Sequence, residues 1–312
     1  MCIVCNNKNL FSQSLTMEYY NCKKIINIPE DDTKFSRLLL YDCPHLNSIP
    51  ATFIKLRSLI SIGCQRITRL PDTLVNLRIV HITESIITSI PDTLVNLIEL
   101  SCNGSACLTS IPDTLINLET LICNRCIRLE TIPGTLINLT TLECSGCPSL
   151  KYIPHTFTNL QYLDLSYCKL IDHIPENMVN LVNLICIFSG IKSIPYIPSL
   201  LNINCSFCMK LTSISASLNL RLLECSGCRL LINIPASETY NYSNCQWLRQ
   251  SIGDVAFNEK LNKLKKLKRW SRRHLYNKRV IERVDKFKYE MFEITLHPDR
   301  LIQTGMIPDY WK

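Results

Sequence analysis

The residues of this chain best suited to chemistry are cysteines in C-x-x-C pairs, at Cys123 and Cys126, Cys144 and Cys147, Cys205 and Cys208, and Cys225 and Cys228. Successive pairs about 20 residues apart have the spacing of a structural zinc site. Yet leucine stands in the first position of the pair at Leu40, before Cys43, and at Leu165, before Cys168. Because leucine cannot ligate a metal, the pattern favours a ladder of buried, reduced thiols over metal or redox chemistry.

Other signatures of catalysis are missing from the sequence. Cys2 and Cys5 form a further C-x-x-C, but no second pair at zinc spacing follows, and we interpret residues 1–13 as a non-repeat lead-in. There is no Gly-rich phosphate loop, no G-x-S-x-G and no H-E-x-x-H, and the chain holds only eight glycines. We therefore expect no catalytic, cofactor or metal site, no small-molecule substrate and no enzymatic activity.

The cysteines recur in phase with an Ile-Pro step. Counting conservative replacements, the step lies at 28–29, 49–50, 70–71, 90–91, 111–112, 132–133, 153–154, 174–175, 194–195, 214–215 and 234–235. Every interval is 20 or 21 residues. A strict period of this length indicates a solenoid, in which each unit buries its apolar side against the next unit.

The unit reads L-x-x-L-x-C-x-x-C-x-x-L-x-x-I-P-x-T-L-x-N and resembles the leucine-rich repeat over residues 14–252, in about 11–12 copies. The short unit and its Ile-Pro step are most similar to bacterial-type repeats. Cysteine in place of asparagine, an Asn- and Ile-rich vocabulary and a basic tail also resemble the repeat proteins of giant DNA viruses, as in mimivirus. The resemblance implies a horseshoe with a concave parallel sheet and a non-catalytic role in protein–protein interaction, against a host protein if the chain is viral.

Each part of the unit predicts a local structure. Alternation predicts a short strand with Leu142 and Cys144 inward and Glu143 and Ser145 outward. The proline that follows must turn the chain, and the return segment is too short for more than one helical turn, so we expect an irregular or 3₁₀ convex side. The buried residues expected to close that side are Leu74, Leu94, Leu115, Leu136, Phe157 and Met178, and the amides expected to bond the backbone are Asn76, Asn96, Asn117, Asn138, Asn159 and Asn180.

A basic segment follows the repeats. Residues 260–288 hold thirteen Lys and Arg against two acidic residues, a net charge of +11 in a chain of net charge +8. Leu261, Leu264, Leu267 and Trp270 recur at spacings of three, which predicts an amphipathic helix within residues 253–312. The segment either caps the last repeat or binds nucleic acid or anionic membrane, with the repeats as a spacer. With this helical tail, the predicted fold class is an α/β repeat solenoid.

The sequence also bears on the compartment. It contains no run of eighteen apolar residues, and Asn6, Asn7, Lys8 and Asn9 interrupt its start where a secretory signal needs an apolar stretch. Eighteen cysteines in phase with a repeat do not form the disulfide framework of a short secreted domain. We expect reduced thiols and a cytoplasmic protein, in the host cell if the chain is viral.

A candidate binding surface emerges when the units are aligned. Tyr167, Phe188 and Phe207 fall in one column of three consecutive units, two residues after the inward position of Cys144. The same column holds Gly104, Gly146 and Gly227 elsewhere, so packing does not require an aromatic residue there. Exposed apolar rows often mark interaction sites, and Tyr162 and Asp164 lie beside this one. The alternative is that the rings only shield the rim of the sheet; the identity of a protein partner is not encoded in this pattern.

Overall fold

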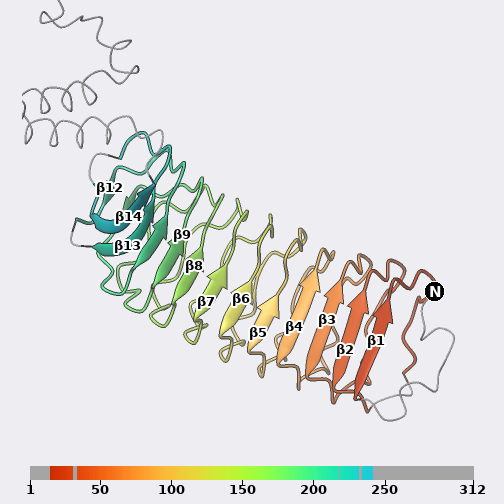
Figure 1. Ribbon diagram of the computed structural model, residues 1–312. Helices are drawn as coiled ribbons and strands as arrows, with labels where there is room; N and C mark the ends of the chain where they lie inside the picture. Colours follow the sequence, from red (N-terminus) through yellow and green to blue (C-terminus); the bar gives the residue numbers. More distant parts are fainter. Residues whose placement is uncertain (1–14, 31–33, 217, 232–233, 242–312) are drawn as a thin grey trace, which may run out of the picture. The chain divides into compact units, whose positions relative to one another are not determined.

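The computed structural model describes residues 15–30, 34–216, 218–231 and 234–241, which coil into successive turns that each add one strand to a parallel sheet (Figure 1). In the described part of the chain this sheet has twelve strands in the order β1-β2-β3-β4-β5-β6-β7-β8-β9-β11-β13-β14. Their bounds are β1 Thr16–Tyr20, β2 Arg37–Tyr41, β3 Ser58–Ile62, β4 Ile79–Thr83, β5 Glu99–Ser101, β6 Thr120–Ile122, β7 Thr141–Glu143, β8 Tyr162–Asp164, β9 Asn183–Ile185, β11 Asn202–Asn204, β13 Asn219–Glu224 and β14 Ala236–Asn241. The parallel stack predicted from the period is therefore confirmed.

The register of the sheet aligns equivalent residues of neighbouring units. Leu142 lies between Leu121 and Leu163. This inward column is buried throughout and consists of Met17, Leu38, Leu59, Val80, Leu100, Leu121, Leu142, Leu163, Leu184, Ile203 and Leu223. The residues expected to close the other side of the coil, from Leu74 to Met178, are all fully buried. Each coil is thus filled by leucine-sized side chains that pack on the coils before and after it.

The returning side of each coil is built from turns, and the described residues contain no helix. The Leu74 N–H donates to the Pro71 carbonyl at 3.3 Å, and the Leu77 N–H donates to the Leu74 carbonyl at 3.1 Å. These three-residue spacings agree with the expected irregular or 3₁₀-like side. The helical part of the predicted α/β class was assigned to residues 253–312, which lie outside the described residues, as do residues 1–13 and the end of the predicted repeat region. The part that the structure describes is all-β.

Two side-chain ladders tie neighbouring coils together at this turn. The Asn117 amide nitrogen donates to the Val95 carbonyl at 2.9 Å, as predicted for this column of asparagines. A parallel ladder of threonines was not anticipated: Thr114 Oγ1 donates to the Asp92 carbonyl at 2.7 Å. Because a turn leaves backbone carbonyls without a sheet partner, these short polar side chains satisfy them from the next unit.

Strand length changes along the stack. β1 to β4 each have five residues, whereas β5 to β9 have three. After the strands β6 and β7 a side-chain oxygen of the preceding unit bonds the backbone: the Asn124 N–H donates to Asn103 Oδ1 at 2.9 Å, and the Ser145 N–H donates to Asn124 Oδ1 at 2.8 Å. At these two units a side chain takes the place of a backbone partner beyond the strand end.

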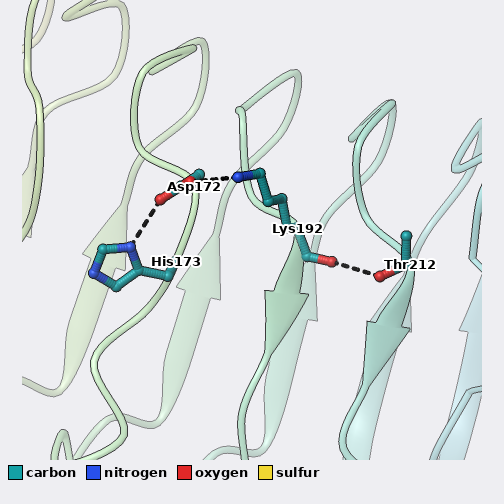
Figure 2. Close-up of polar contacts among 4 residues, drawn as sticks. All are labelled: Asp172, His173, Lys192 and Thr212. Atoms are coloured by element: carbon teal, nitrogen blue, oxygen red, sulfur yellow. Dashed lines mark hydrogen bonds and ion pairs between the residues drawn. The ribbon is translucent and has the colours of Figure 1, made fainter.

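A second edge of the coil carries a short two-stranded sheet, β10 (Ser193–Ile194) with β12 (Ser213–Ile214), and a column of charges. Figure 2 shows Asp172 between His173 Nδ1, 2.8 Å from Asp172 Oδ1, and Lys192 Nζ, 2.7 Å from Asp172 Oδ2. The hydrogen bonds from Lys192 and His173 lower the pKa of Asp172 to about 2. The same column contains the pair Glu130–Lys151, with Lys151 Nζ 2.6 Å from Glu130 Oε2.

The lowered pKa of Asp172 gives a pH-dependent prediction. A carboxyl whose folded pKa lies below its unfolded value stabilises the fold above the unfolded pKa, and this contribution disappears as the pH falls toward about 2. Asp172→Asn should therefore lower the melting temperature at pH 7. The difference in melting temperature between this variant and the wild type should become smaller as the pH falls from about 4 to about 2. Asp113→Asn, which removes an exposed carboxylate that takes part in no ion pair among the described residues, is the control. A pH-independent difference for Asp172→Asn would contradict this assignment.

The packing of the inward column gives a second prediction. Leu142 is completely buried, so Leu142→Ala should reduce the free energy of unfolding by about 2–5 kcal/mol through lost burial and a residual cavity. Ile137, which is half exposed on the turn, supplies the matched variant Ile137→Ala, for which we expect a loss below about 1 kcal/mol. Urea denaturation of the two variants measures both values, and equal losses would show that the inward column is not the core.

Candidate interaction surface

The residue two positions after the inward cysteine column adopts a left-handed backbone conformation in every described unit. Its φ lies between 50° and 73° throughout. The residues are Asn21, Asp42, Gly63, Glu84, Gly104, Arg125, Gly146, Tyr167, Phe188, Phe207 and Gly227. Here the chain leaves the strand and turns into the coil, and the N–H of Tyr167 donates to the Ile187 carbonyl of the next unit at 2.7 Å. The conformation is therefore imposed by the coil and not by the residue.

This conformation suits only some residue types. Glycine adopts it freely and Asn or Asp tolerates it, whereas a residue with a larger side chain pays roughly 1–2 kcal/mol. Tyr167, Phe188 and Phe207 occupy it in three consecutive units, with φ of 63°, 54° and 61°. The sequence shows glycines in this column, and they could have indicated a left-handed backbone. We did not predict this conformation from the sequence.

The three aromatic side chains form a stacked row, which we call the ring row. The ring centroids of Tyr167 and Phe188 are 5.3 Å apart with an interplanar angle of 16°. Those of Phe188 and Phe207 are 4.7 Å apart at 3°. Tyr167 is 51% and Phe188 38% exposed, while Phe207 is half-buried. The alignment of these residues predicted from the sequence is confirmed, but the rings lie on the turns beyond the strand ends, at the edge of the sheet.

Glycines lie on both sides of the ring row. A Cβ atom at Gly227 would lie 2.6 Å from Cδ1 of Phe207, so this ring packs against the Gly227 backbone and ends the row. In the unit before Tyr167 the column holds Gly146, whose nearest side-chain neighbour is Cγ of Arg125, 3.4 Å from the position of an added Cβ. Gly146 therefore places no side chain of its own beside Tyr167, whose ring contact in the described part of the chain is with Phe188 on the other side, and we call this the open end of the row.

Tyr162 and Asp164 project from the outward face of β8, the strand that precedes Tyr167, and are half-buried. Burial, with the nearby charges of Asp164 and Glu143, raises the pKa of Tyr162. Glu143 is the register partner of Asp164 on β7. Its outward direction was predicted, but the sequence analysis did not select it because only the sheet register places the two carboxylates side by side.

The cysteines of the two repeat columns lie inside the coil, as predicted, and most of those of the second column bond to the backbone of the neighbouring unit. Cys147 Sγ donates to the Cys123 carbonyl at 3.1 Å, and Cys168 Sγ donates to the Cys144 carbonyl at 3.0 Å. Where serine occupies this column the ladder continues, with Ser85 Oγ 3.1 Å from Ser105 Oγ. The second cysteine of each pair therefore links consecutive units through its thiol.

The two thiols of a pair differ in their electrostatics. Hydrogen bonding to Cys123 lowers the pKa of Cys147, and hydrogen bonding to Cys186 lowers the pKa of Cys208 to about 7, although both side chains are fully buried.

The first thiols of the pairs agree with a structural role. Hydrogen bonding to Cys168, followed by burial, raises the pKa of Cys144 well above its ordinary value, and Cys228 with burial does the same for Cys205. A thiol in such surroundings stays protonated and unreactive. Cys123, Cys126, Cys144 and Cys147 are free thiols, and within the described ranges no group of three or more His, Cys, Asp or Glu residues is placed to hold a metal ion.

Comparison with known families agrees with this geometry. A family model described as Leucine Rich Repeat matches residues 159–181, which contain β8 and its turn. These residues repeat the strand, turn and buried columns of the other units. The family match and the repeated geometry together support a leucine-rich-repeat fold for the described part of the chain. No curated protein sequence matches it.

Several solved leucine-rich-repeat structures are similar in part. They include the leucine-rich repeat domain of the type III effector XopL, with 21% identity over 63% of this chain and 65% of that chain and a TM-score of 0.37. A leucine-rich-repeat protein of Leptospira interrogans has 15% identity over 73% of this chain and 79% of that one, with a TM-score of 0.34. The functional domain of InlJ from Listeria monocytogenes, described as including a cysteine ladder, has 15% identity over 74% and 63% and a TM-score of 0.43. The match thus spans just under two thirds of the XopL domain.

Two further observations concern membrane-spanning helices and the basic segment. The described residues include no helix that is long and apolar enough to cross a membrane. The basic residues 260–288, predicted to cap the repeats or to bind nucleic acid or anionic membrane, lie outside the described residues. Of the two candidate binding sites, the ring row is the one that lies within the described residues.

The burial of the thiols gives a third prediction. Cys144, Cys147, Cys225 and Cys228 are at most 1% exposed, so a bulky maleimide should modify them only after denaturation. Cys107, which is partly exposed, serves as the internal reference and should react sooner. Peptide mapping by mass spectrometry after short labelling of the native protein separates these sites. Labelling of Cys144 or Cys147 as fast as Cys107 would show that the ladder is accessible.

Proposed function

We propose that this protein is a non-catalytic scaffold that binds a protein partner through the ring row, with Tyr162 and Asp164 of β8 contributing polar contacts. A leucine-rich-repeat fold is typical of protein–protein interaction scaffolds. The single observation that carries the proposal is a stacked row of three aromatic side chains, two of them exposed, at positions where the backbone favours glycine.

The energetics of the ring row support a role other than stability. Each aromatic residue in the left-handed conformation costs roughly 1–2 kcal/mol relative to a relaxed backbone. Each stacked pair returns only about 0.5–1.5 kcal/mol beyond burial, and the row contains two pairs. Stacking therefore does not outweigh the strain of three residues. Glycine occupies the same column at Gly146 and Gly227, so the coil itself does not require a ring there.

The surface chemistry of the row fits binding. Aromatic rings that are held rigid before a partner arrives lose little conformational entropy on binding, and they often dominate the energy of an interface. Tyr167 and Phe188 are each held by a stacked neighbour and remain exposed. The competing interpretation, that the rings only shield the rim of the sheet, predicts that their removal destabilises the fold.

The setting of the interaction is part of the proposal. Free, buried thiols suit a reducing compartment, and we place the protein in the cytoplasm. The resemblance of the repeats to those of giant DNA viruses makes a host protein the first partner to test.

The test replaces the ring row by the residue that the backbone prefers. The triple variant Tyr167→Gly, Phe188→Gly, Phe207→Gly should change the free energy of unfolding by less than about 1 kcal/mol, because relief of strain offsets lost stacking. Its capture of specific partners from a host-cell extract, quantified by mass spectrometry, should fall at least tenfold.

The control makes equivalent backbone changes away from the row. Asn21→Gly, Asp42→Gly, Glu84→Gly alters three residues of the same left-handed column and should leave capture unchanged. Partners lost with the ring-row variant and retained with this control support the proposal. Reduced stability with undiminished capture would instead assign the rings to shielding the sheet.

A further inference from the structure

The charges next to the ring row indicate which partner chemistry the surface fits. The outward side chains of β7, β8, β9 and β11 include the carboxylates of Glu143 and Asp164 and no basic group. Bases do lie outside this set: Lys169 follows Tyr167 on the turn, and Arg125 lies in the left-handed column two units before Tyr167, with its side chain over Gly146. The outward face of these four strands is therefore negative, and these bases lie on the turns beyond it.

Glu143 and Asp164 are register partners on adjacent parallel strands, whose backbones lie about 4.8 Å apart. Like charges directly across a strand pair repel each other. Among the described residues, neither carboxylate takes part in an ion pair. A cation brought by a partner would relieve this repulsion.

The two carboxylates are already fixed in position, and each keeps one oxygen for a partner. Glu143 Oε2 accepts a hydrogen bond from the Asn124 amide nitrogen at 3.0 Å. Asp164 Oδ1 accepts one from the Ser166 N–H at 2.8 Å. Glu143 Oε1 and Asp164 Oδ2 have no hydrogen-bond partner within the described part of the chain. Because the two carboxylates are already held in place, a partner that binds them causes little loss of conformational entropy.

Tyr167 completes the surface, three residues after Asp164 on the turn that follows β8. Its ring stacks on Phe188 on one side, and it is half exposed where Gly146 has no side chain. The face of an aromatic ring attracts a cation, and a guanidinium can stack on it while its planar N–H groups bond carboxylates. An ammonium carries its charge at one point and cannot do both in this way.

We propose that the partner bound by the ring row presents an arginine side chain, which stacks on Tyr167 and donates hydrogen bonds to Glu143 Oε1 and Asp164 Oδ2. This assignment depends on the proposed scaffold function and names the chemistry that the surface recognises. The occupant is a segment of another protein, selected by charge complementarity with the two carboxylates.

A phage-displayed library of random twelve-residue peptides, selected on the full chain, tests the assignment. Peptides that bind the wild type and not the double variant Glu143→Gln, Asp164→Asn should be enriched in arginine over its frequency in the library. Both replacements keep the side-chain oxygens that accept from Asn124 and Ser166, so the fold should persist, as thermal melting checks. Enrichment in lysine, in aromatic residues or in no residue would overturn the proposal.

The best peptide is then synthesised with arginine or with citrulline, which keeps the shape and loses the charge. Citrulline, or either Glu143→Gln or Asp164→Asn alone, should weaken binding about tenfold or more. Glu224→Gln is the matched control: this carboxylate lies in the same outward column on β13, away from the open end of the row, and its replacement should leave binding unchanged. Equal binding of the arginine and citrulline peptides contradicts the inference.

The ring-row variant separates this inference from the proposed function. Peptides that bind the wild type and the carboxylate variants equally, but not the triple glycine variant, would leave the scaffold function standing and refute the arginine assignment. Peptides that bind the triple glycine variant as well as the wild type would refute both.

Discussion

Each coil of this solenoid can bury its leucines only against the coil before it and the coil after it. Leu142 is completely buried because Leu121 and Leu163 lie beside it in the sheet register. The polar groups of the turn obey the same rule, since asparagine, threonine and cysteine side chains all bond the backbone of a neighbouring unit. Stability is therefore built from contacts between adjacent units, and no single centre holds the fold together.

The same constraint determines which positions are free to carry function. A side chain inside the coil must match the size of its neighbours, as the buried cysteine and leucine columns do. The left-handed position at the strand end lies outside the buried columns, and its side chain has to fit only the neighbours in its own column, as Gly227 does beside the Phe207 ring. Glycine, charged residues and aromatic residues all occur at this position, with different backbone strain. Tyr167, Phe188 and Phe207 have high strain there, and the packing of the coil does not require them.

Charge is distributed differently over the two sides of the coil. On the edge that carries β10 and β12, acidic and basic groups alternate and pair, as Glu130 does with Lys151 and Asp172 with Lys192. On the sheet beside the ring row, Glu143 and Asp164 bond only to neutral groups among the described residues. Exposed pairs contribute little stability, so the contrast matters mainly for recognition, where an unpaired and oriented charge selects a partner.

The sequence by itself determined the period, the parallel stack, the inward direction of Leu142 and Cys144 and the alignment of the three rings, because a repeat of constant length brings equivalent residues into register. It also predicted the asparagine bonds at the turn, which depend on local geometry. The left-handed backbone of the ring row, the threonine ladder and the free oxygens of Glu143 and Asp164 were decided only by the tertiary structure. These features depend on how a turn in one unit meets the carbonyls and side chains of the next, at distances that spacing along the chain does not specify.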